Sequence, residues 1–517
     1  MSRAHTALLL GLGVALEAAA FPPLSLWPLA FGMLAPLAAY ALVAAPRHVF
    51  AFAWAQHLLA GLLVGHWFVH ALAVEYEAPL APGFAFLVLV FGSYAVVPAA
   101  AAALFARLRA RVPAVLLALH FGALFALAEW LRAEPLALPW LLAAQPLAGV
   151  PLLIQGADLG GAYLPGLCVA ALGAGIGIAA VRRSALPLAV PVALLALATG
   201  YGAIRMAAAS ERGPTIEIGV VQAAVPQRER FRPGSALRNT QHHVELTQKL
   251  AAAGPVDLVV WSETSVDDDL DAHPELQALL RFAAAQAGAP IVTGAPRSAG
   301  GRRTNAVVEI DATGIRASYD KQKLVPFAES DPATVGFLAG LLGPVTEGQP
   351  YVAGRSATVF PGPIPFATPI CFEITDAGLV RRFRTAGARL LVNLTNDAWF
   401  GRTGYADLHL AQAVFRAVEL RTWIARGTNT GISAVIDPAG RVVARLDVGV
   451  EGILRARVGE AWPASLYARL GSAPFVALLA ALAIGSLLRP RRTPGARSGV
   501  GARRSRPGRR GGRRARP

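Results

Sequence analysis

The sequence predicts a membrane protein of two parts, a bundle of apolar α-helices and one α/β domain outside the membrane. Three observations predict this. Of the 517 residues, 55% are hydrophobic and only 15% are charged, whereas soluble proteins average about 25% charged residues. Long apolar stretches recur in the first 205 residues, and a region of about 240 residues between Ile204 and Leu470 has none of comparable length. An ordinary soluble protein is therefore excluded.

Eight apolar stretches of roughly 16 to 26 residues are long enough to cross a hydrocarbon core of ~30 Å. Seven precede the α/β region and one follows it: Thr6–Phe21, Leu24–Ala44, Val49–Val74, Gly83–Ala106, Val112–Leu131, Gly161–Val181, Ala185–Ile204 and Leu470–Leu488. Leu136–Gly156 is apolar but contains three prolines, so we expect an external re-entrant or interfacial segment. The first stretch follows Arg3 and is interpreted as a span, with a signal peptide as the alternative.

The arginines predict the orientation, because short cytoplasmic loops hold an excess of Lys and Arg. If the N-terminus is inside, the inner loops carry Arg47, Arg107, Arg109, Arg111, Arg182 and Arg183. The α/β region then lies outside and the C-terminal tail inside. The tail from Arg489 has 12 arginines and no acidic residue, which predicts disorder. It supplies most of the net charge of +16, so this charge indicates orientation and not nucleic-acid binding.

We therefore expect four segments: a seven-span membrane domain at 1–210, an external domain at 215–458, an eighth helix at 468–488 and a disordered tail at 489–517. Within the external domain, β-rich runs alternate with helical stretches. The predicted strands are Ile216–Val221, Leu258–Trp261, Ile291–Thr293, Ala306–Ile310, Pro369–Cys371 and Leu390–Leu394, and the predicted helices include Ser235–Ala253 and Pro274–Ala287. Functional sites of α/β folds lie at the carboxyl ends of strands.

Two candidate residues stand at such ends. Glu263 directly follows Leu258–Trp261, where the alternative is an ordinary polar strand end. Cys371 ends another run and is the only cysteine of the external domain; an unpaired thiol outside the cytoplasm is either buried or used. Its position, with Glu373 two residues later, resembles a nucleophile on a strand-to-helix turn. The other cysteine, Cys168, lies in an apolar stretch and is interpreted as packing.

Lys321 and Lys323 are two of only three lysines among 48 basic residues. In a strand both would face one side. Since this chain otherwise uses Arg, a Lys indicates a place where a compact point charge is needed. The alternative is a solvated edge.

Together Glu263, Lys321 and Cys371 fit a nucleophilic acyl-transfer site. A thiol has an ordinary pKa of about 8.5 and needs a base. A buried carboxylate can serve as that base, and a fixed ammonium can stabilise the oxyanion of a tetrahedral intermediate.

These motifs resemble those of the apolipoprotein N-acyltransferases, membrane enzymes of bacterial lipoprotein maturation whose external domain belongs to the nitrilase, or carbon-nitrogen hydrolase, superfamily. The matching motifs are Trp-Ser-Glu263-Thr, Lys321-Gln-Lys-Leu-Val-Pro-Phe-Ala-Glu329, Ile-Cys371-Phe-Glu373-Ile, Asn396-Asp-Ala-Trp399-Phe-Gly, Arg416-Ala-Val-Glu419, Glu129-Trp-Leu-Arg132 and Leu138-Pro-Trp140-Leu. The resemblance covers nearly everything except the tail. It implies a nitrilase-like α-β-β-α sandwich inserted before the last of eight membrane helices.

By this resemblance Glu263 is the general base, Lys321 the oxyanion-stabilising cation and Cys371 the nucleophile that becomes a thioester. The implied supporting residues are Glu329 beside Lys321, Trp399 in the acyl or lipid pocket, and Phe372, Glu373, Phe231 and Asn396. The chain departs from the usual family pattern at Phe231, Lys323, Ala328, Phe372 and Leu408. None of these belongs to the Glu-Lys-Cys set, so the departures concern substrate preference and rate more than the reaction.

The resemblance implies a ping-pong reaction. The acyl chain passes from a membrane phospholipid to Cys371 and then to the N-terminal α-amine of a diacylglyceryl lipoprotein. No metal, cofactor or nucleic acid is implied. We expect a monomer in the bacterial inner membrane, with the catalytic domain on the periplasmic side and both termini in the cytoplasm. Thr334–Pro350 carries Gly and Pro and is a candidate for a lid.

Two other functions stay open at this point. One is a membrane-tethered nitrilase-type amidase that uses the same Glu-Lys-Cys triad. The other is a transporter or an inactive scaffold. The spans contain few ionisable residues, which argues against an ion path through them. His242, His243 and Glu245 are not in the order of a zinc-binding helix motif and are interpreted as a surface helix.

Overall fold

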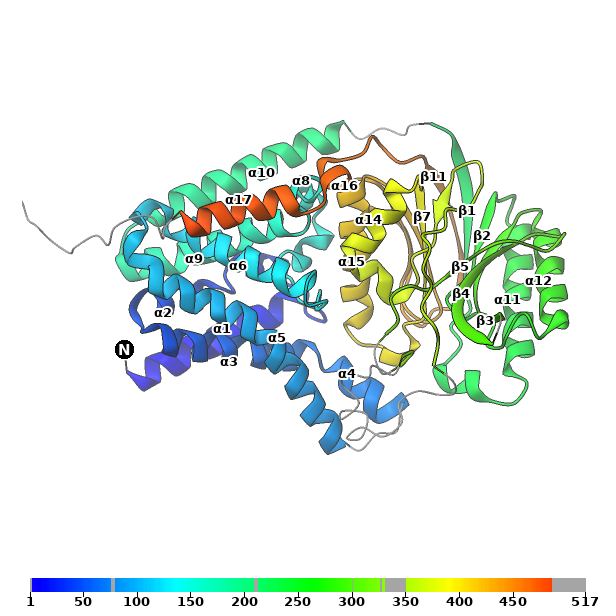
Figure 1. Ribbon diagram of the computed structural model, residues 1–517, viewed down its shortest axis with the longest axis horizontal. Helices are drawn as coiled ribbons and strands as arrows, with labels where there is room; N and C mark the ends of the chain where they lie inside the picture. Colours follow the sequence, from blue (N-terminus) through cyan, green and yellow to red (C-terminus); the bar gives the residue numbers. More distant parts are fainter. Residues whose placement is uncertain are drawn as a thin grey trace, which may run out of the picture.

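The computed structural model describes residues 2–75, 80–208, 213–299, 301–325, 328–330 and 350–485, and these form two parts side by side (Figure 1). One part is a bundle of helices built from both ends of the described chain. The other contains two β-sheets and the helices that cover them. The predicted lid up to residue 349 and the tail 489–517 lie outside the described residues.

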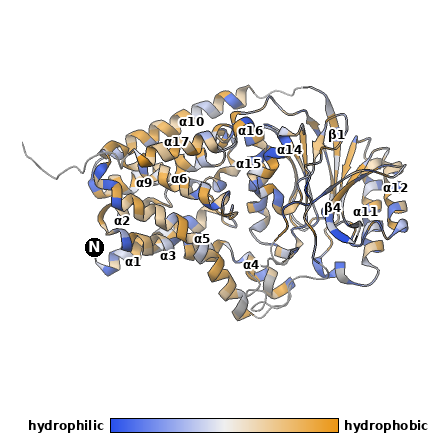
Figure 2. Ribbon diagram, viewed as in Figure 1, coloured by the Kyte–Doolittle hydropathy of each residue, from blue (hydrophilic) through white to orange (hydrophobic). Residues whose placement is uncertain are grey.

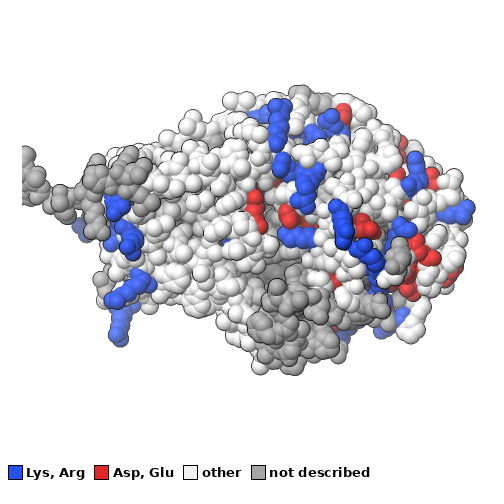
Figure 3. Space-filling model, viewed as in Figure 1, with Lys and Arg blue, Asp and Glu red and all other residues white. Residues whose placement is uncertain are grey.

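Each of the eight apolar stretches overlaps at least one helix. The helices of the bundle are α1 Arg3–Ala20, η1 Trp27–Phe31, α2 Ala35–Val43, α3 Pro46–Val64, α4 Trp67–His70, α5 Leu80–Leu108, α6 Leu117–Ala133, α9 Tyr163–Arg182, α10 Ala189–Ala207 and α17 Ala473–Ile484. Their residues are mostly apolar (Figure 2), and the visible flank of the bundle carries almost no charge until its far end (Figure 3). This surface suits a hydrocarbon environment.

Four helical segments of the described chain are long and apolar enough to cross a membrane: Gly83–Arg111, Ala114–Ala133, Tyr163–Arg182 and Leu186–Ala207. Pro46–Val64 and Trp67–Glu75, bent by 52° from each other, make a fifth if they count as one span. Trp27–Val43 and Ala473–Ile484 are shorter apolar helices.

The proline-rich segment after α6 is irregular, as its sequence predicts, and contains only the short helices η5 Gln145–Gly149 and α7 Pro151–Ile154. Arg132 fixes its start, since this buried guanidinium donates hydrogen bonds to the carbonyl oxygens of Leu138 at 3.0 Å and Trp140 at 2.6 Å. A buried charge that makes such bonds holds the loop in one shape. As a result, Trp140 is held against the α/β part.

The α/β part is a helix–sheet–sheet–helix sandwich (Figure 1). The strand orders are β11-β1-β2-β3-β4-β5 and β10-β9-β8-β7-β6. Helices α11 Ser235–Ala252 and α12 Pro274–Ala287 cover the first sheet, and α14 Ala377–Thr385 and α15 Tyr405–Leu420 lie between the second sheet and the helical bundle. The strands are β1 Thr215–Gln222, β2 Leu258–Val260, β3 Ile291–Ala299, β4 Arg302–Ile310, β5 Ile315–Asp320, β6 Phe366–Ala367, β7 Leu390–Thr395, β8 Trp423–Thr428, β9 Ser433–Ile436, β10 Val442–Leu446 and β11 Gly452–Gly459.

Alternation along the strands explains the layers. In β2, Leu258 and Val260 pack into the core that is shared with the second sheet, whereas Val259 packs with the residues of α11 and α12. Both faces of this central strand are therefore covered, which is why it reads as a continuous apolar run. The parallel pairs β1–β2, β2–β3, β6–β7 and β7–β8 bring the carboxyl ends of their strands together.

One predicted strand is wrong. Pro369–Cys371 is not a strand: β6 ends at Ala367, and Ile370 makes only an isolated parallel bridge to Leu394. Pro369 has no N–H to donate to a ladder, so pairing cannot continue through it. Cys371 instead begins the 3-10 helix η9, Cys371–Thr375.

Candidate active site

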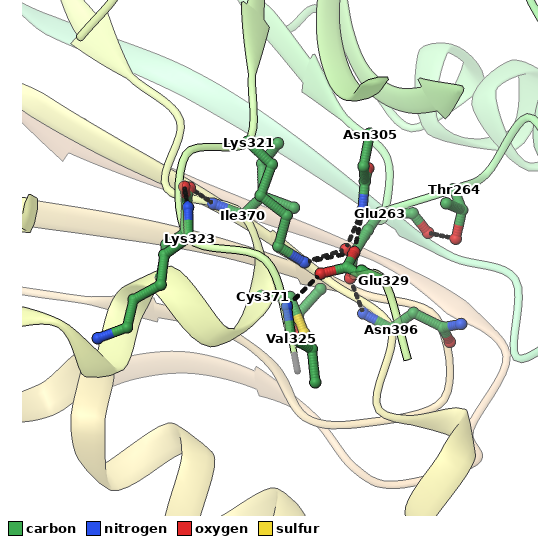
Figure 4. Close-up of polar contacts among 12 residues, drawn as sticks. Glu263, Thr264, Asn305, Lys321, Lys323, Val325, Glu329, Ile370, Cys371 and Asn396 are labelled. Atoms are coloured by element: carbon green, nitrogen blue, oxygen red, sulfur yellow. Dashed lines mark hydrogen bonds and ion pairs between the residues drawn. The ribbon is translucent and has the colours of Figure 1, made fainter. Parts of the chain in front are cut away.

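The predicted Glu, Lys and Cys come together where strands of both sheets end (Figure 4). Glu263 lies just after β2, Lys321 follows β5, and Cys371 follows β6. The first two belong to one sheet and the third to the other. The site therefore exists only where the two sheets pack together.

Lys321 is the buried cation of this site, with a side chain only 1% exposed. Its Nζ lies 3.0 Å from Glu263 Oε1 and 2.9 Å from Glu329 Oε1. Its backbone N–H donates to the carbonyl of Asn305 at 2.9 Å. Burial lowers the pKa of Lys321, but the carboxylates of Glu263 and Glu329 outweigh it and raise this pKa well above its usual value. The ammonium therefore stays charged.

Glu263 is held at both carboxylate oxygens. Asn305 Nδ2 donates to Oε1 at 2.9 Å, and the backbone N–H of Asn396 donates to Oε2 at 3.0 Å. The next residue, Thr264, has φ +50°, and β3 passes so close that a Cβ on Gly294 would lie 2.5 Å from the Thr264 nitrogen. A glycine at 294 is thus what lets this turn approach the sheet.

Glu329 joins the same cluster from the loop after β5. Asn305 Nδ2 donates to its Oε1 at 2.7 Å, and the backbone N–H of Val325 donates to its Oε2 at 2.7 Å. One amide and one ammonium therefore bridge the two carboxylates. This matches the predicted place of Glu329 next to Lys321.

Cys371 occupies a left-handed backbone conformation with φ +47°. Such a conformation costs a non-glycine residue about 1–3 kcal/mol and persists only where the surroundings hold it. The predicted nucleophile-like turn is therefore present, although a 3-10 helix and not a longer helix follows it.

Glu373 is fully buried and ties this turn to the lysine loop. Its carboxylate accepts four hydrogen bonds, from Tyr319 Oη at 2.8 Å and from the backbone N–H groups of Gln322 at 2.6 Å, Lys323 at 3.0 Å and Ile370 at 2.8 Å. The sequence predicts Glu373 only as a neighbour of the nucleophile. The structure shows a carboxylate that links the two segments.

The electrostatics leave the thiol dependent on a base. Burial, the largest cause, and the Glu263 carboxylate raise the pKa of the Cys371 thiol above its usual value, while the Lys321 ammonium opposes them. The thiol is therefore protonated at neutral pH. Attack by sulfur requires that a neighbouring group removes this proton.

The prediction that Lys321 and Lys323 face one side is wrong. Strand β5 ends at Asp320, so the two lysines lie in a turn, and Figure 4 shows their side chains pointing apart. Lys323 is partly exposed and pairs with Asp376 at 2.9 Å. Its ammonium also lies 5.5 Å from the ring centroid of Phe372.

Aromatic rings lead from Phe372, the neighbour of Cys371, to the helical bundle, and we call them the aromatic wall: Phe372, Trp140, Tyr405, Trp67 and Phe400. The ring centroids are 6.3 Å apart for Phe372–Trp140, 5.5 Å for Trp140–Tyr405, 4.8 Å for Trp67–Tyr405 and 5.1 Å for Trp67–Phe400. Trp67 begins α4 of the bent helix pair, so the wall crosses from one part to the other.

The other predicted supporting residues fall nearby with different contacts. Trp399 is half-buried in the 3-10 helix η10, Ala398–Phe400, beside the aromatic wall. The backbone of Asn396 holds Glu263, and its side chain accepts from Asn429 Nδ2 at 3.1 Å. Phe231 ends the 3-10 helix η7, Gln227–Phe231, and its side chain lies outside what the structure describes.

Sequence reasoning missed Asn305 and Trp67. Asn305 is a polar residue ahead of the apolar run Ala306–Ile310, and that interruption is the signal that could have found it. Trp67 lies in an apolar stretch, where a tryptophan gives no signal of its own.

Comparison with known proteins agrees with the two-part organisation. The family model described as apolipoprotein N-acyltransferase N-terminal domain matches residues 13–175, and the model described as carbon-nitrogen hydrolase matches residues 217–461. Among solved structures, an amidase of the nitrilase superfamily from Nesterenkonia AN1 matches 50% of this chain and 96% of its own at 18% identity, with a TM-score of 0.38.

Curated relatives named apolipoprotein N-acyltransferase match across both parts. The protein of Allorhizobium ampelinum is 32% identical over 65% of this chain and 66% of its own length. That of Bradyrhizobium diazoefficiens is 34% identical over 71% and 72%, and that of Geobacter metallireducens is 28% identical over 92% and 94%. The chain belongs to the apolipoprotein N-acyltransferase family.

Proposed function

We propose that this protein transfers a fatty acyl chain from a membrane phospholipid, through a thioester on Cys371, to the N-terminal α-amine of diacylglyceryl-cysteine in apolipoproteins. The observation that carries the proposal is the aromatic wall, which joins the neighbour of Cys371 to the apolar helices. A reactive thiol with that connection suits an acyl donor that stays in the membrane. Family membership supports the same activity.

In the first half-reaction, Glu263 takes the thiol proton and the Cys371 sulfur attacks the ester carbonyl of the phospholipid. The carbonyl oxygen becomes an oxyanion, and the Lys321 ammonium stabilises it. The ester C–O bond then breaks, Glu263 returns its proton to the departing oxygen, and lysophospholipid leaves. Glu329 accepts from the Lys321 ammonium, and Asn305 donates to both Glu263 and Glu329, so the cation and the base keep fixed positions relative to each other.

In the second half-reaction the free α-amine of the lipoprotein attacks the thioester carbonyl. Glu263 removes a proton from the amine, the C–S bond breaks, and the proton passes to the sulfur. An amide forms and the Cys371 thiol is regenerated. The same base and cation thus serve both halves of a ping-pong reaction.

Lipid anchoring of both substrates gives a physical reason for the two-part architecture. Moving an acyl chain from lipid to water costs ~0.8 kcal/mol per CH₂. A site that opens at the membrane surface avoids most of that cost. Trp140, in the irregular segment that follows α6, lies 6.3 Å from Phe372 between ring centroids, so the Cys371 end of the second sheet lies close to the helical bundle.

The proposed topology has eight spans with the catalytic domain, residues 215–458, inserted before the eighth. The domain faces the periplasm, and both termini and the arginine-rich tail lie on the cytoplasmic side of the inner membrane. The excess of arginine in the inner loops supports this orientation. We propose a monomer that needs no cofactor, because one chain supplies the base, the cation and the nucleophile.

The direct test is mass spectrometry of the purified protein after incubation with phospholipid. We expect an acyl-sized mass increment on Cys371 that a diacylated lipopeptide amine discharges and water does not. Cys371→Ala should show no increment, whereas Cys168→Ala, the matched control at the buried cysteine of α9, should behave as wild type. Rapid discharge by water would instead favour a membrane-tethered amidase. Full N-acylation by Cys371→Ala would exclude the proposal.

A further inference from the structure

A second polar cluster touches the backbone of Cys371. It consists of His409 on α15, Asp397 after β7 and Arg426 on β8, and each of these residues is at most 2% exposed. His409 Nε2 lies 3.2 Å from the carbonyl oxygen of Cys371, and its Nδ1 lies 2.9 Å from Asp397 Oδ1. Residues of three separate segments therefore form one cluster, and His409 is the member that contacts the Cys371 carbonyl.

The partners define which atom donates. A carbonyl oxygen can only accept, so the bond to Cys371 requires a hydrogen on His409 Nε2. With the hydrogen on Nε2, the Nδ1 atom of the neutral ring can accept from Arg426 Nη2, which lies 3.1 Å away. A second hydrogen on Nδ1, pointing at Asp397 Oδ1, requires the imidazolium, which burial and the Arg426 charge disfavour because they lower the pKa of His409. Arg426 Nη2 also donates to Asp397 Oδ2 at 2.9 Å. Burial opposes the charge of Asp397, but His409 and Arg426 outweigh it and lower the pKa of Asp397 to about 2. The Asp397 carboxylate is therefore ionised at neutral pH.

Arg426 is itself held by several hydrogen bonds. Its guanidinium donates to Asn393 Oδ1 and to the carbonyl of Ile432, and Asn393 Nδ2 in turn donates to the carbonyl of Pro369 at 2.8 Å. Asn393 of β7 thus holds the chain at Pro369, and His409 of α15 holds it again at Cys371. Between these two points the backbone changes from extended at Ile370 to left-handed at Cys371.

We infer that His409 is a positioning residue of the acyl transfer: its Nε2–H holds the Cys371 carbonyl and with it the left-handed turn that presents the thiol to Glu263 and Lys321. This inference rests on the proposed function, since it assigns His409 to the nucleophile of that reaction.

Two physical consequences make the contact more than packing. A backbone at φ +47° relaxes unless its surroundings hold it, and relaxation moves the sulfur away from its base and cation. The Cys371 carbonyl also shares a peptide group with the N–H of Phe372, which lies in the first turn of η9, where N–H groups have no acceptor within the helix. A hydrogen bond at the carbonyl strengthens that N–H as a donor.

Two substitutions of similar size separate positioning from packing. His409→Gln places an amide nitrogen about where Nε2 stands and keeps a donor for Cys371, whereas His409→Asn keeps a donor toward Asp397 and loses the contact with Cys371. We expect His409→Asn to slow thioester formation from phospholipid on the order of 10- to 100-fold, with KM for the phospholipid unchanged. His409→Gln should recover most of the rate.

Alkylation of Cys371 by iodoacetamide tests the positioning role without any lipid. In a Cys168→Ala background, His409→Asn should react more slowly than His409→Gln and wild type. His243→Asn is the control, because His243 of α11 is similarly buried but packs on Trp261, at 4.9 Å between ring centroids, and bonds to the backbone of its own helix and not to that of Cys371. If alkylation responds in this way but wild type forms no thioester, the proposed function fails and the role of His409 stands.

Two results would overturn the inference. In one, His409→Asn and His409→Gln both form the thioester and react with iodoacetamide at wild-type rates. In the other, both variants slow equally and melt at the same lowered temperature, which would make His409 a packing residue only.

Discussion

Two buried charge clusters of this protein have opposite composition. At the active site one cation, Lys321, lies between two carboxylates, Glu263 and Glu329. At the junction of the two parts one carboxylate, Asp158 of α8 Ala157–Gly160, lies between two cations, Arg421 at 2.6 Å and Arg205 at 3.1 Å. The active-site cluster is buried, whereas in the junction cluster Asp158 and Arg421 are buried and Arg205 is partly exposed. Each cluster joins segments that are far apart in the sequence.

The difference between the two clusters shows why one uses Arg421 and the other Lys321. Arg421 spreads its fork over Asp158, the side chain and carbonyl of Gln155 and the carbonyl of Pro438, so it fastens the catalytic domain to the helical bundle. Among the described residues, the Lys321 ammonium donates to two carboxylates, which leaves its third hydrogen for another acceptor. A compact ammonium suits a site that must stabilise an oxyanion, whereas a planar guanidinium with several donors suits a contact between two parts of the protein.

The largest expected effect is at the base. Glu263→Gln keeps the shape of the side chain and removes its ability to take a proton, so thioester formation should fall about 10²- to 10⁴-fold. Stopped-flow or quenched mass spectrometry of the acyl-enzyme measures this rate. A fall of less than tenfold would mean that another group deprotonates the thiol.

Lys321→Arg tests the comparison of the two clusters directly, because it places in the active site the residue type that the junction cluster uses. The charge is kept, but a planar fork between Glu263 and Glu329 cannot aim a point charge at the oxyanion, so we expect a loss of about 10²- to 10³-fold in the acylation rate. Lys321→Met should lose at least as much. Activity close to wild type in Lys321→Arg would show that charge alone is enough.

The pH dependence of Cys371 alkylation should move in opposite directions in the two active-site variants. The Glu263 carboxylate raises the pKa of the Cys371 thiol, so Glu263→Gln should shift the alkylation profile to lower pH. The Lys321 ammonium lowers that pKa, so Lys321→Met should shift the profile to higher pH. Shifts on the order of one pH unit are expected. Shifts of the same sign would contradict the described cluster.

Asp158→Asn should weaken the contact between the two parts of the protein without changing the acylation step. Removing this carboxylate leaves the buried Arg421 guanidinium without its charged partner, which destabilises by about 3–5 kcal/mol. We expect a lower melting temperature in detergent and an unchanged acylation rate per folded molecule. A large loss of rate at full stability would instead assign Asp158 to the active site.

The smallest effect is expected at the other lysine of the loop. Lys323 pairs with Asp376 at a partly exposed position, and such pairs contribute about 0–1 kcal/mol. Lys323→Gln should therefore change the acylation rate by less than about threefold. A loss like that of Lys321→Met would mean that both lysines act on the substrate.

The sequence alone predicted the site where chemistry is carried by rare residues. Scarce Lys and Cys pointed to Lys321 and Cys371, and both lie in the cluster with Glu263. It failed where tertiary contacts decide the backbone: the end of β5 at Asp320 separates Lys321 from Lys323, and Pro369 stops the strand before Cys371. His409 acts through a contact between a helix and a turn far apart in the chain, which no local pattern records, and Asn305 is marked only by a polar interruption ahead of an apolar run.

Glu373 has a consequence for how the protein matures. Its carboxylate joins the lysine loop, which follows the first sheet, to the cysteine turn, which follows the second. A newly made chain in which the sheets have not yet docked has a thiol with neither its base nor its cation nearby. With the roles proposed for Glu263 and Lys321, the thiol meets its base and its cation only after the two sheets dock, and the Glu373 carboxylate bonds both segments in that docked state.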